Sequence, residues 1–175
     1  MTRTRSLRSS EGKAGSSPPG APLSAALRML SRRALSEGEV RFRLMEKGFT
    51  EAQAAAALAR LRDLGLVDDT TLCTNLARSY RDVRRLGPRR IVGALLLRRF
   101  PRDLVEASVR AVSRPEDELA AAAAALGKKF RGGIPGGREG AAKAFRFLSG
   151  RGFSPGTCRQ AIRGLSGDII EEGEG

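Results

Sequence analysis

Histidine and tryptophan are absent from the chain, and tyrosine occurs once. Histidine is the commonest general base and metal ligand at neutral pH, so its absence removes Ser–His and Cys–His catalytic pairs. Carboxylates do not compensate. A two-metal nuclease needs several that converge, and residues 71–115 offer only Asp82, Asp103 and Glu106. We therefore expect no enzyme, and neither a catalytic residue, a bound metal nor a cofactor.

Cysteine is scarce and long apolar runs are missing. Cys73 and Cys158 match no metal-binding spacing and lie inside helical patterns, so we expect two small buried side chains in a reducing compartment. No apolar run reaches the roughly 18 residues that a membrane span needs. The start of the chain contains arginines but no apolar stretch typical of a signal peptide. The sequence thus favours a cytoplasmic protein that does not contact a membrane.

Runs of β-branched residues are also missing, and helix formers dominate, so we expect almost no sheet. What the chain does contain is one pattern written three times. In each copy a basic residue and a phenylalanine end one helical segment, and a residue typical of helix caps begins the next. The three phenylalanines are Phe49, Phe100 and Phe153, which are 51 and 53 residues apart. The apolar positions around the three phenylalanines also agree. Five residues before each Phe stand Leu44, Leu95 and Leu148. Nine residues after it stand Leu58, Val109 and Ile162, and twelve residues after it stand Leu61, Val112 and Leu165. Self-similarity at this period predicts a repeat architecture whose units stack.

Each unit has the start and stop signals of three short helices. Ser36 with Glu39 and Thr50 with Gln53 are capping boxes, and Ser154 is a cap followed by Pro155 at a first helical position. Residues from about Thr70 to Leu86 are expected to form one long helix. We predict an all-α fold of three tandem three-helix repeats forming an elongated curved rod. Its expected parts are a disordered basic tail (1–20), repeat 1 (21–69), repeat 2 (70–114), repeat 3 (115–167) and an acidic tail (168–175).

Positive charge is unevenly distributed along the chain. The formal net charge is +13, with net +8 in residues 71–115 but only +1 in residues 21–70. Arginine outnumbers lysine 27 to 5, as GC-rich coding DNA would also produce without functional demand. That explanation does not account for the concentration of charge in the middle repeat. A positive field of this size attracts nucleic acid or an acidic protein surface.

Candidate binding residues form a basic stripe on the middle repeat and a second cluster in the third. Each arginine taken alone also fits a solvated helix face, so the cluster carries the argument. The candidates are Arg78, Arg81, Arg85, Arg89, Arg90, Arg98 and Arg99, with Lys128, Lys129 and Arg131 as the second set.

Five segments, taken in order over about residues 22–165, resemble the bacterial RecX regulatory proteins. They are Ala26–Arg33, Ser36–Val40 with Leu44 and Lys47–Phe49, Gly65–Asp69, Gly87–Ile91 with Leu95, and Phe147–Ser154. The resemblance implies a non-enzymatic modulator of the RecA recombinase, with three tandem three-helix repeats in a curved shape. Such a protein lies in the groove of the RecA–DNA filament and limits recombination and the SOS response to DNA damage. We expect a monomer that binds the filament through the basic residues above.

Two other functions remain open on the sequence. A plain helical DNA-binding protein, similar to helix-turn-helix regulators, would place a basic helix in a major groove. Asn and Gln, which would read base edges, are scarce, and one Tyr without Trp makes a poor stacking platform for single strands. The other possibility is a solenoid that binds only protein and whose arginines merely reflect base composition.

Overall fold

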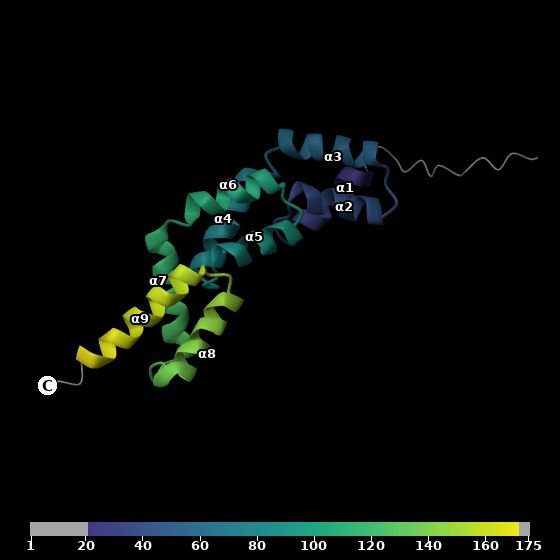
Figure 1. Cartoon of the computed structure of the whole chain (residues 1–175). Helices are drawn as coiled ribbons and strands as arrows, with labels where there is room; N and C mark the ends of the chain where they lie inside the picture. The colour runs from purple at the N-terminus through teal and green to yellow at the C-terminus, as the bar shows by residue number, and fades with distance from the viewer. Residues whose placement is uncertain (1–20, 172–175) are drawn as a thin grey trace, which may run out of the picture.

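The computed structural model describes residues 21–171, with side chains described as far as Leu165, and within this range the regular structure is entirely helical (Figure 1). Each repeat contributes three consecutive helices. Their bounds are α1 Ala21–Leu30, α2 Glu37–Glu46, α3 Glu51–Asp63, α4 Asp69–Asp82, α5 Pro88–Leu97, α6 Arg102–Val112, α7 Pro115–Lys129, α8 Gly137–Gly150 and α9 Pro155–Glu171. The all-α repeat fold predicted from the sequence is confirmed. The tails at residues 1–20 and 172–175 lie outside the described part of the chain.

Local capping chemistry fixes where these helices begin. At α2 the Ser36 side chain accepts the backbone N–H of Glu39, and the Glu39 carboxylate accepts the N–H of Ser36. Thr50 and Gln53 make the same reciprocal pair at α3. Both capping boxes are therefore present as predicted, and each satisfies two backbone donors that a helix start leaves without partners.

The prediction of one long helix to Leu86 is wrong, because α4 ends at Asp82. Arg85 adopts a left-handed backbone conformation with φ 52°, and the Leu86 N–H turns back to donate to the carbonyl of Tyr80. A left-handed residue just past the last turn is a common way to end a helix. The early stop leaves a five-residue connection, 83–87, in which the carbonyls of Arg84 and Arg85 accept hydrogen bonds from Arg151 of repeat 3.

Each repeat buries its own small core, and the equivalent positions found in the sequence occupy it. Leu44, Leu95 and Leu148 are all fully buried. The three clusters centre on α1–α3, α4–α6 and α7–α9. In the third, alanines of α7 such as Ala122 and Ala125 replace large side chains, and partly buried aromatics, among them Phe130 and Phe147, fill the remaining volume. Units this small are stabilised by stacking on their neighbours.

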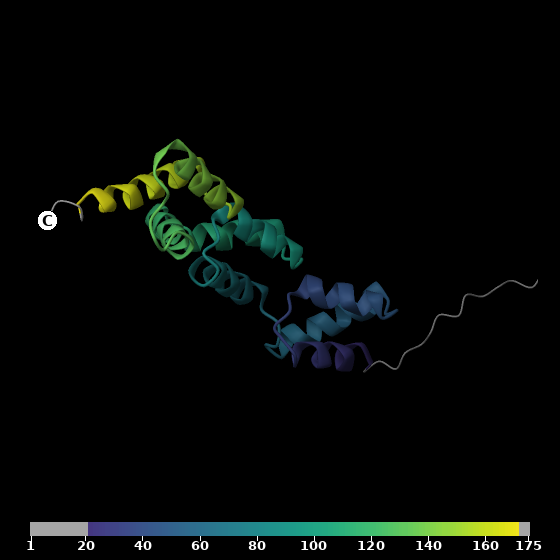
Figure 2. The same ribbon diagram turned by 90° about the horizontal axis from the view of Figure 1, so that it is seen from below.

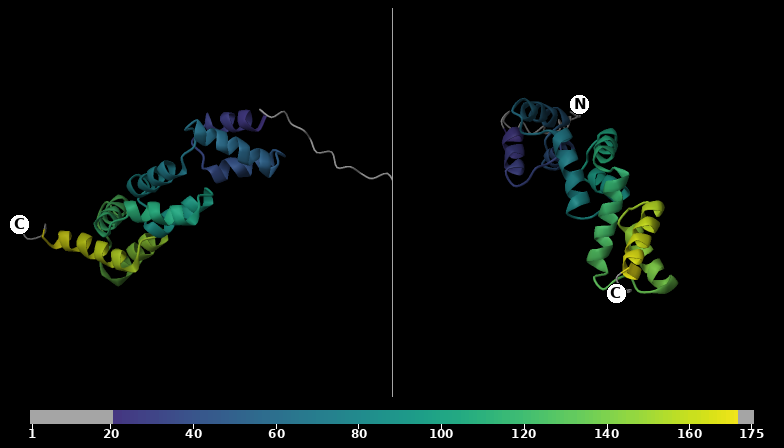
Figure 3. Two further views of the ribbon diagram at one scale, coloured as in Figure 1. Left: turned by 90° about the horizontal axis from the view of Figure 1, so that it is seen from above. Right: turned by 90° about the vertical axis from the view of Figure 1, so that its left-hand side faces the viewer.

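The repeats stack end to end into an elongated, bent array (Figure 1). Seen from below, the second helices α2, α5 and α8 lie nearer the viewer than α3 and α6 (Figure 2), whereas the view from above brings α3 and α6 to the front (Figure 3). In repeats 1 and 2 the second and third helices thus line opposite sides of the array.

One contact joins both pairs of neighbouring repeats. The basic residue two positions before the repeated Phe, Arg98 or Arg151, reaches back to the preceding repeat. Its guanidinium donates to a loop carbonyl there, from Arg98 to Ala34 at 2.8 Å and from Arg151 to Arg84 at 2.6 Å. The backbone carbonyl of the same arginine accepts a hydrogen bond from the residue just before the second helix of the preceding repeat. The Arg98 carbonyl accepts from the Ser36 hydroxyl at 2.5 Å, and the Arg151 carbonyl accepts from the Gly87 N–H at 2.8 Å. The stacking geometry therefore repeats with the sequence.

Candidate polyanion-binding interface

A basic pocket of about 410 Å³ lies at the junction of repeats 2 and 3. Its walls come from the connection after α4, the last turn of α7 and the end of α8, and they include five cationic side chains. The lining residues are Val83, Arg84, Arg85, Ala125, Lys128, Lys129, Phe147 and Arg151. Among the described residues, no carboxylate oxygen lies within 4.0 Å of a cationic nitrogen of this pocket. Uncompensated cations that converge on one hollow form a site for phosphate or carboxylate oxygens.

The pocket unites members of the two predicted sets. Arg85 belongs to the first set and Lys128 and Lys129 to the second, although more than 40 residues separate them in the sequence. The short end of α4 explains the meeting, because the connection that follows it bends toward the end of α8. Arg151 then ties the two repeats together by donating to the carbonyls of Arg84 and Arg85, at 2.6 and 3.3 Å.

Sequence reasoning did not assign Arg84 and Arg151 to the site. Arg84 stacks over the Tyr80 ring at 4.8 Å, and Arg151 stacks over Phe147 at 4.9 Å, so both guanidinium groups are held in place by aromatic faces. The signal for Arg151 was present in the repeated pattern, since a basic residue precedes each of the three repeated Phe residues by two positions.

Arg81, a predicted binding residue, is committed to contacts inside the stack. Its side chain is 18% exposed, binds Asp82 at 2.6 Å and Asp117 of α7 at 3.2 Å, and donates to the carbonyl of Val112. The hydrogen bond to Asp82 is the main cause of a raised pKa for Arg81, and burial opposes it. Arg81 therefore stabilises the passage from repeat 2 to repeat 3 and offers little to an external ligand.

Arg98 is held in the same way at the other junction. Its side chain is 16% exposed and donates to the Glu39 carboxylate at 2.7 Å. Arg33 donates to the same carboxylate at 2.8 Å. Burial raises the pKa of Glu39, but the hydrogen bonds from Arg98, Arg33 and the Ser36 N–H outweigh it and hold that pKa below its ordinary value. The ionised carboxylate is thus the centre of the contact between repeats 1 and 2.

The remaining predicted residues are more accessible. Arg99 is exposed, with its guanidinium 3.7 Å above the Phe42 ring of repeat 1. The exposed residues for which no ion pair is found in the described chain are Arg78, Arg89, Arg90, Lys128, Lys129 and Arg131. These side chains, together with the junction pocket, are the best candidates for contact with a polyanion.

The described residues contain no group of three or more His, Cys, Asp or Glu side chains arranged to hold a metal ion. Cys73 and Cys158 are free and fully buried, as predicted, and burial raises the pKa of both thiols. Within the described range, none of the helices has the length and apolar character required to cross a bilayer.

Comparison with known proteins identifies the family to which this helical array belongs. The models for the first and the third three-helix domain of RecX match residues 23–61 and 116–162. The chain is 38% identical over 155 residues to the regulatory protein RecX of Thermus thermophilus. The aligned segment covers 87% of this chain and 95% of that protein. The chain belongs to the RecX family. A RecX regulatory protein of Acidithiobacillus ferrooxidans is 34% identical over 142 residues, covering 81% of this chain and 88% of its own length.

The fold of the family agrees with the helical stack. The crystal structure of RecX from Lactobacillus salivarius matches with a TM-score of 0.73 at 20% identity, covering 85% of this chain and 96% of the other. A second RecX crystal structure matches with a TM-score of 0.68 at 21% identity, covering 83% of this chain. At such identities the likeness concerns the fold, and the basic pocket is a property of this chain's own residues.

Proposed function

We propose that this chain binds the RecA–DNA filament and inhibits the recombinase and ATPase activities of RecA, and so acts in homologous recombination and DNA repair. Membership of the RecX family supports the proposal, since the relatives are named regulatory proteins. The observation that carries it to particular residues is the basic pocket between repeats 2 and 3. We propose a regulator that acts by binding and not by catalysis, as a cytoplasmic monomer.

An elongated stack suits a filament better than a globular partner. Repeats in a linear array present equivalent positions at regular intervals, so one molecule can contact more than one protomer of the filament at a time. The exposed cations add attraction toward the nucleic acid inside the filament. Such a molecule blocks protomer addition or favours release, and either action lowers the number of active protomers.

The test is RecA-catalysed ATP hydrolysis on single-stranded DNA, with the cognate RecA and this protein well below one copy per protomer. Inhibition at that ratio supports capping or disruption of filaments. Inhibition only near saturation, reversed by extra DNA, would mean competition for the polyanion and would refute filament modulation. In that case, tight sequence-selective binding to naked duplex DNA would support the alternative of a helix-turn-helix-like DNA-binding protein.

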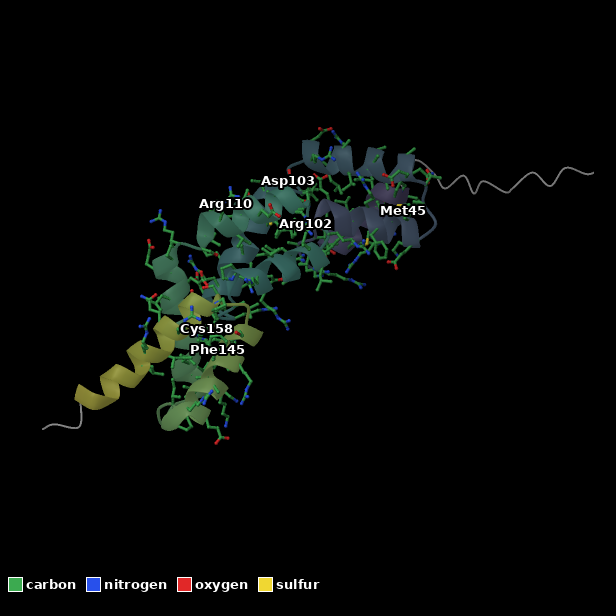
Figure 4. The ribbon with its side chains drawn as sticks, viewed as in Figure 1. Met45, Arg102, Asp103, Arg110, Phe145 and Cys158 are labelled. Carbon is green, nitrogen blue, oxygen red and sulfur yellow. The ribbon has the colours of Figure 1, made fainter. Side chains whose placement is uncertain are left out.

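The residue assignment is tested with the exposed cations that have no described role in the stack. Arg78, Arg89 and Arg90 are replaced by Ala in one variant, and Lys128 and Lys129 in another. Each variant should weaken inhibition by about tenfold or more and flatten its dependence on salt, because each lost phosphate contact reduces the counterions released. A matched control replaces Arg60, Arg110 and Arg159, which are exposed on α3, α6 and α9. Figure 4 shows Arg110 on the side of α6 away from α5. Equal inhibition by the variants and the control would refute the assignment.

A further inference from the structure

Repeat 1 contains a basic groove, distinct from the junction pocket, although the net charge of its sequence is close to zero. The groove lies between α1 and α2 and has a volume of about 390 Å³. Ala25 and Met29 supply its apolar lining, and five cationic residues supply the rest: Arg28, Arg32, Arg33, Arg43 and Lys47. Repeat 1 has seven acidic residues against eight basic ones in residues 21–70. The two signs are nevertheless separated in space.

Three acidic side chains of repeat 1 form ion pairs. Glu37 binds Arg62 at 2.7 Å, Glu51 binds Arg41 at 3.4 Å, and Glu39 is the centre of the junction with repeat 2. Only Arg33 of the groove shares in these pairs, through Glu39. For the other four cations of the groove, no carboxylate oxygen of the described residues lies within 4.0 Å. The groove therefore has a strong local positive potential despite the balance of the unit.

The internal repeat indicates what such a groove binds. Lys47 stands two positions before Phe49, where Arg98 and Arg151 stand in the next two repeats. Those two arginines each donate to a carbonyl oxygen of the preceding repeat. In the described chain no repeat precedes repeat 1, and Phe49 is only partly buried where Phe100 and Phe153 are 3% and 2% exposed. Among the described residues, Lys47 of repeat 1 is thus exposed at the position whose basic side chain binds carbonyl oxygens of a neighbouring repeat in both other repeats.

The two basic hollows also correspond in position. Arg43 of α2 and Lys47 just after it line the groove at the repeat positions where Phe147 of α8 and Arg151 just after it line the junction pocket. The groove includes a residue of α2 and the junction pocket a residue of α8, and α2, α5 and α8 lie along one side of the array (Figure 2). Arg90 of α5 is exposed between them in the sequence of repeats. A linear polyanion with evenly spaced charges fits this layout better than a compact acidic patch.

We propose that the groove between α1 and α2 binds backbone phosphates of a nucleic-acid strand, as a second contact in addition to the junction pocket. Guanidinium groups bind phosphate oxygens through paired hydrogen bonds, and the groove supplies three that have no described carboxylate partner, from Arg28, Arg32 and Arg43. The contact reads no bases, so it is independent of sequence. It goes beyond the proposed action on RecA, because it requires nucleic acid alone.

The test measures binding of the full chain to a fluorescently labelled single-stranded oligonucleotide without RecA, by anisotropy across a salt series. The variant replaces Arg28, Arg32 and Arg43 with Gln, and the control replaces Arg60, Arg110 and Arg159 with Gln, which removes the same charge from the third helices. We expect the groove variant to raise Kd at least about tenfold at low salt. The slope of log Kd against log salt should fall by about 2, since each lost contact to a single strand contributes about 0.7. The control should shift both far less.

A third variant separates charge from folding. Lysine at the same three positions keeps the charge and should preserve the salt slope, while far-UV circular dichroism and urea unfolding verify that all variants fold. Equal binding by the Gln variant and the control would overturn the proposal. So would a defect seen only with RecA filaments, because that result would assign the groove to an acidic protein surface. A failure of RecA inhibition with the DNA effect intact would instead refute the proposed function and leave this groove standing.

Discussion

The contact that should most affect the cohesion of the stack is the carboxylate of Glu39. Its side chain is 11% exposed and accepts hydrogen bonds from Arg98, Arg33 and the Ser36 N–H. Removing one partner of a fully buried pair costs about 3–5 kcal/mol. Here both side chains keep some contact with water, and Gln retains an oxygen acceptor. We therefore expect Glu39→Gln to lower the free energy of unfolding by about 2 kcal/mol.

The effect of pH follows from the lowered pKa of Glu39. A carboxyl whose pKa is lower in the folded than in the unfolded protein stabilises the fold fully above its unfolded pKa, which is about 4.3 for glutamate. That stabilisation is lost as the pH falls through the folded pKa. The difference between the native chain and Glu39→Gln should thus be constant between about pH 5 and 7 and shrink in more acidic solution.

Urea unfolding followed by circular dichroism at several pH values measures both effects. Because repeats couple mainly to their neighbours, a weakened first junction should also broaden the transition as repeat 1 unfolds early. The control is Glu106→Gln, which removes the 3.6 Å pair with Arg102 on α6, where the side chains are 51% and 70% exposed. Such surface pairs contribute about 0–1 kcal/mol. The reasoning is refuted if Glu39→Gln costs no more than this control, or if the difference persists unchanged in acid.

Two further predictions concern the second junction and the thiols. Gly152→Ala should destabilise the protein by about 3 kcal/mol, because the residue has φ 87° and an added Cβ would meet the backbone of Arg90. Gly48 has a similar φ of 85° but open space around it, so Gly48→Ala should cost only the backbone strain of about 1–2 kcal/mol. Equal losses of stability in urea unfolding would contradict the close approach at Gly152. Cys73 and Cys158 are fully buried with raised pKa values, so a disulfide reagent at neutral pH should label them only as fast as the protein opens, and rapid labelling of the native chain would show that these sites are accessible.

The sequence was sufficient where structure depends on neighbouring residues. The capping boxes at Ser36 and Thr50 are recognisable from spacing alone, because donor and acceptor are three residues apart. The repeat positions are recognisable because Leu44 and its two equivalents must be apolar to be buried. Local spacing failed at the end of α4, where the left-handed Arg85 and the contact with repeat 3 stop a helix whose own residues favour continuing.

The sequence was insufficient where charges meet across long separations. Arg98 fits a solvated basic stripe, yet its partner Glu39 lies 59 residues earlier, and Arg81 finds Asp117 36 residues later. The groove of repeat 1 illustrates the reverse case. The charges of residues 21–70 sum to +1, but the ion pairs of Glu37, Glu39 and Glu51 leave four cations of the groove without a described carboxylate partner. Net charge per segment therefore neither identifies nor excludes a binding surface.

One position explains why two junctions of the same geometry differ in charge. Ten residues before the repeated Phe stands Glu39 in repeat 1, but Arg90 in repeat 2. The carboxylate of Glu39 pairs with the guanidinium of Arg98, which crosses the first junction, so Arg98 is committed to the contact between repeats 1 and 2. At the second junction Arg151 binds only carbonyl oxygens among the described residues, and the cations around it keep their field. The repeat thus uses one docking mode for two purposes: a junction closed by ion pairs between repeats 1 and 2, and an open basic pocket between repeats 2 and 3.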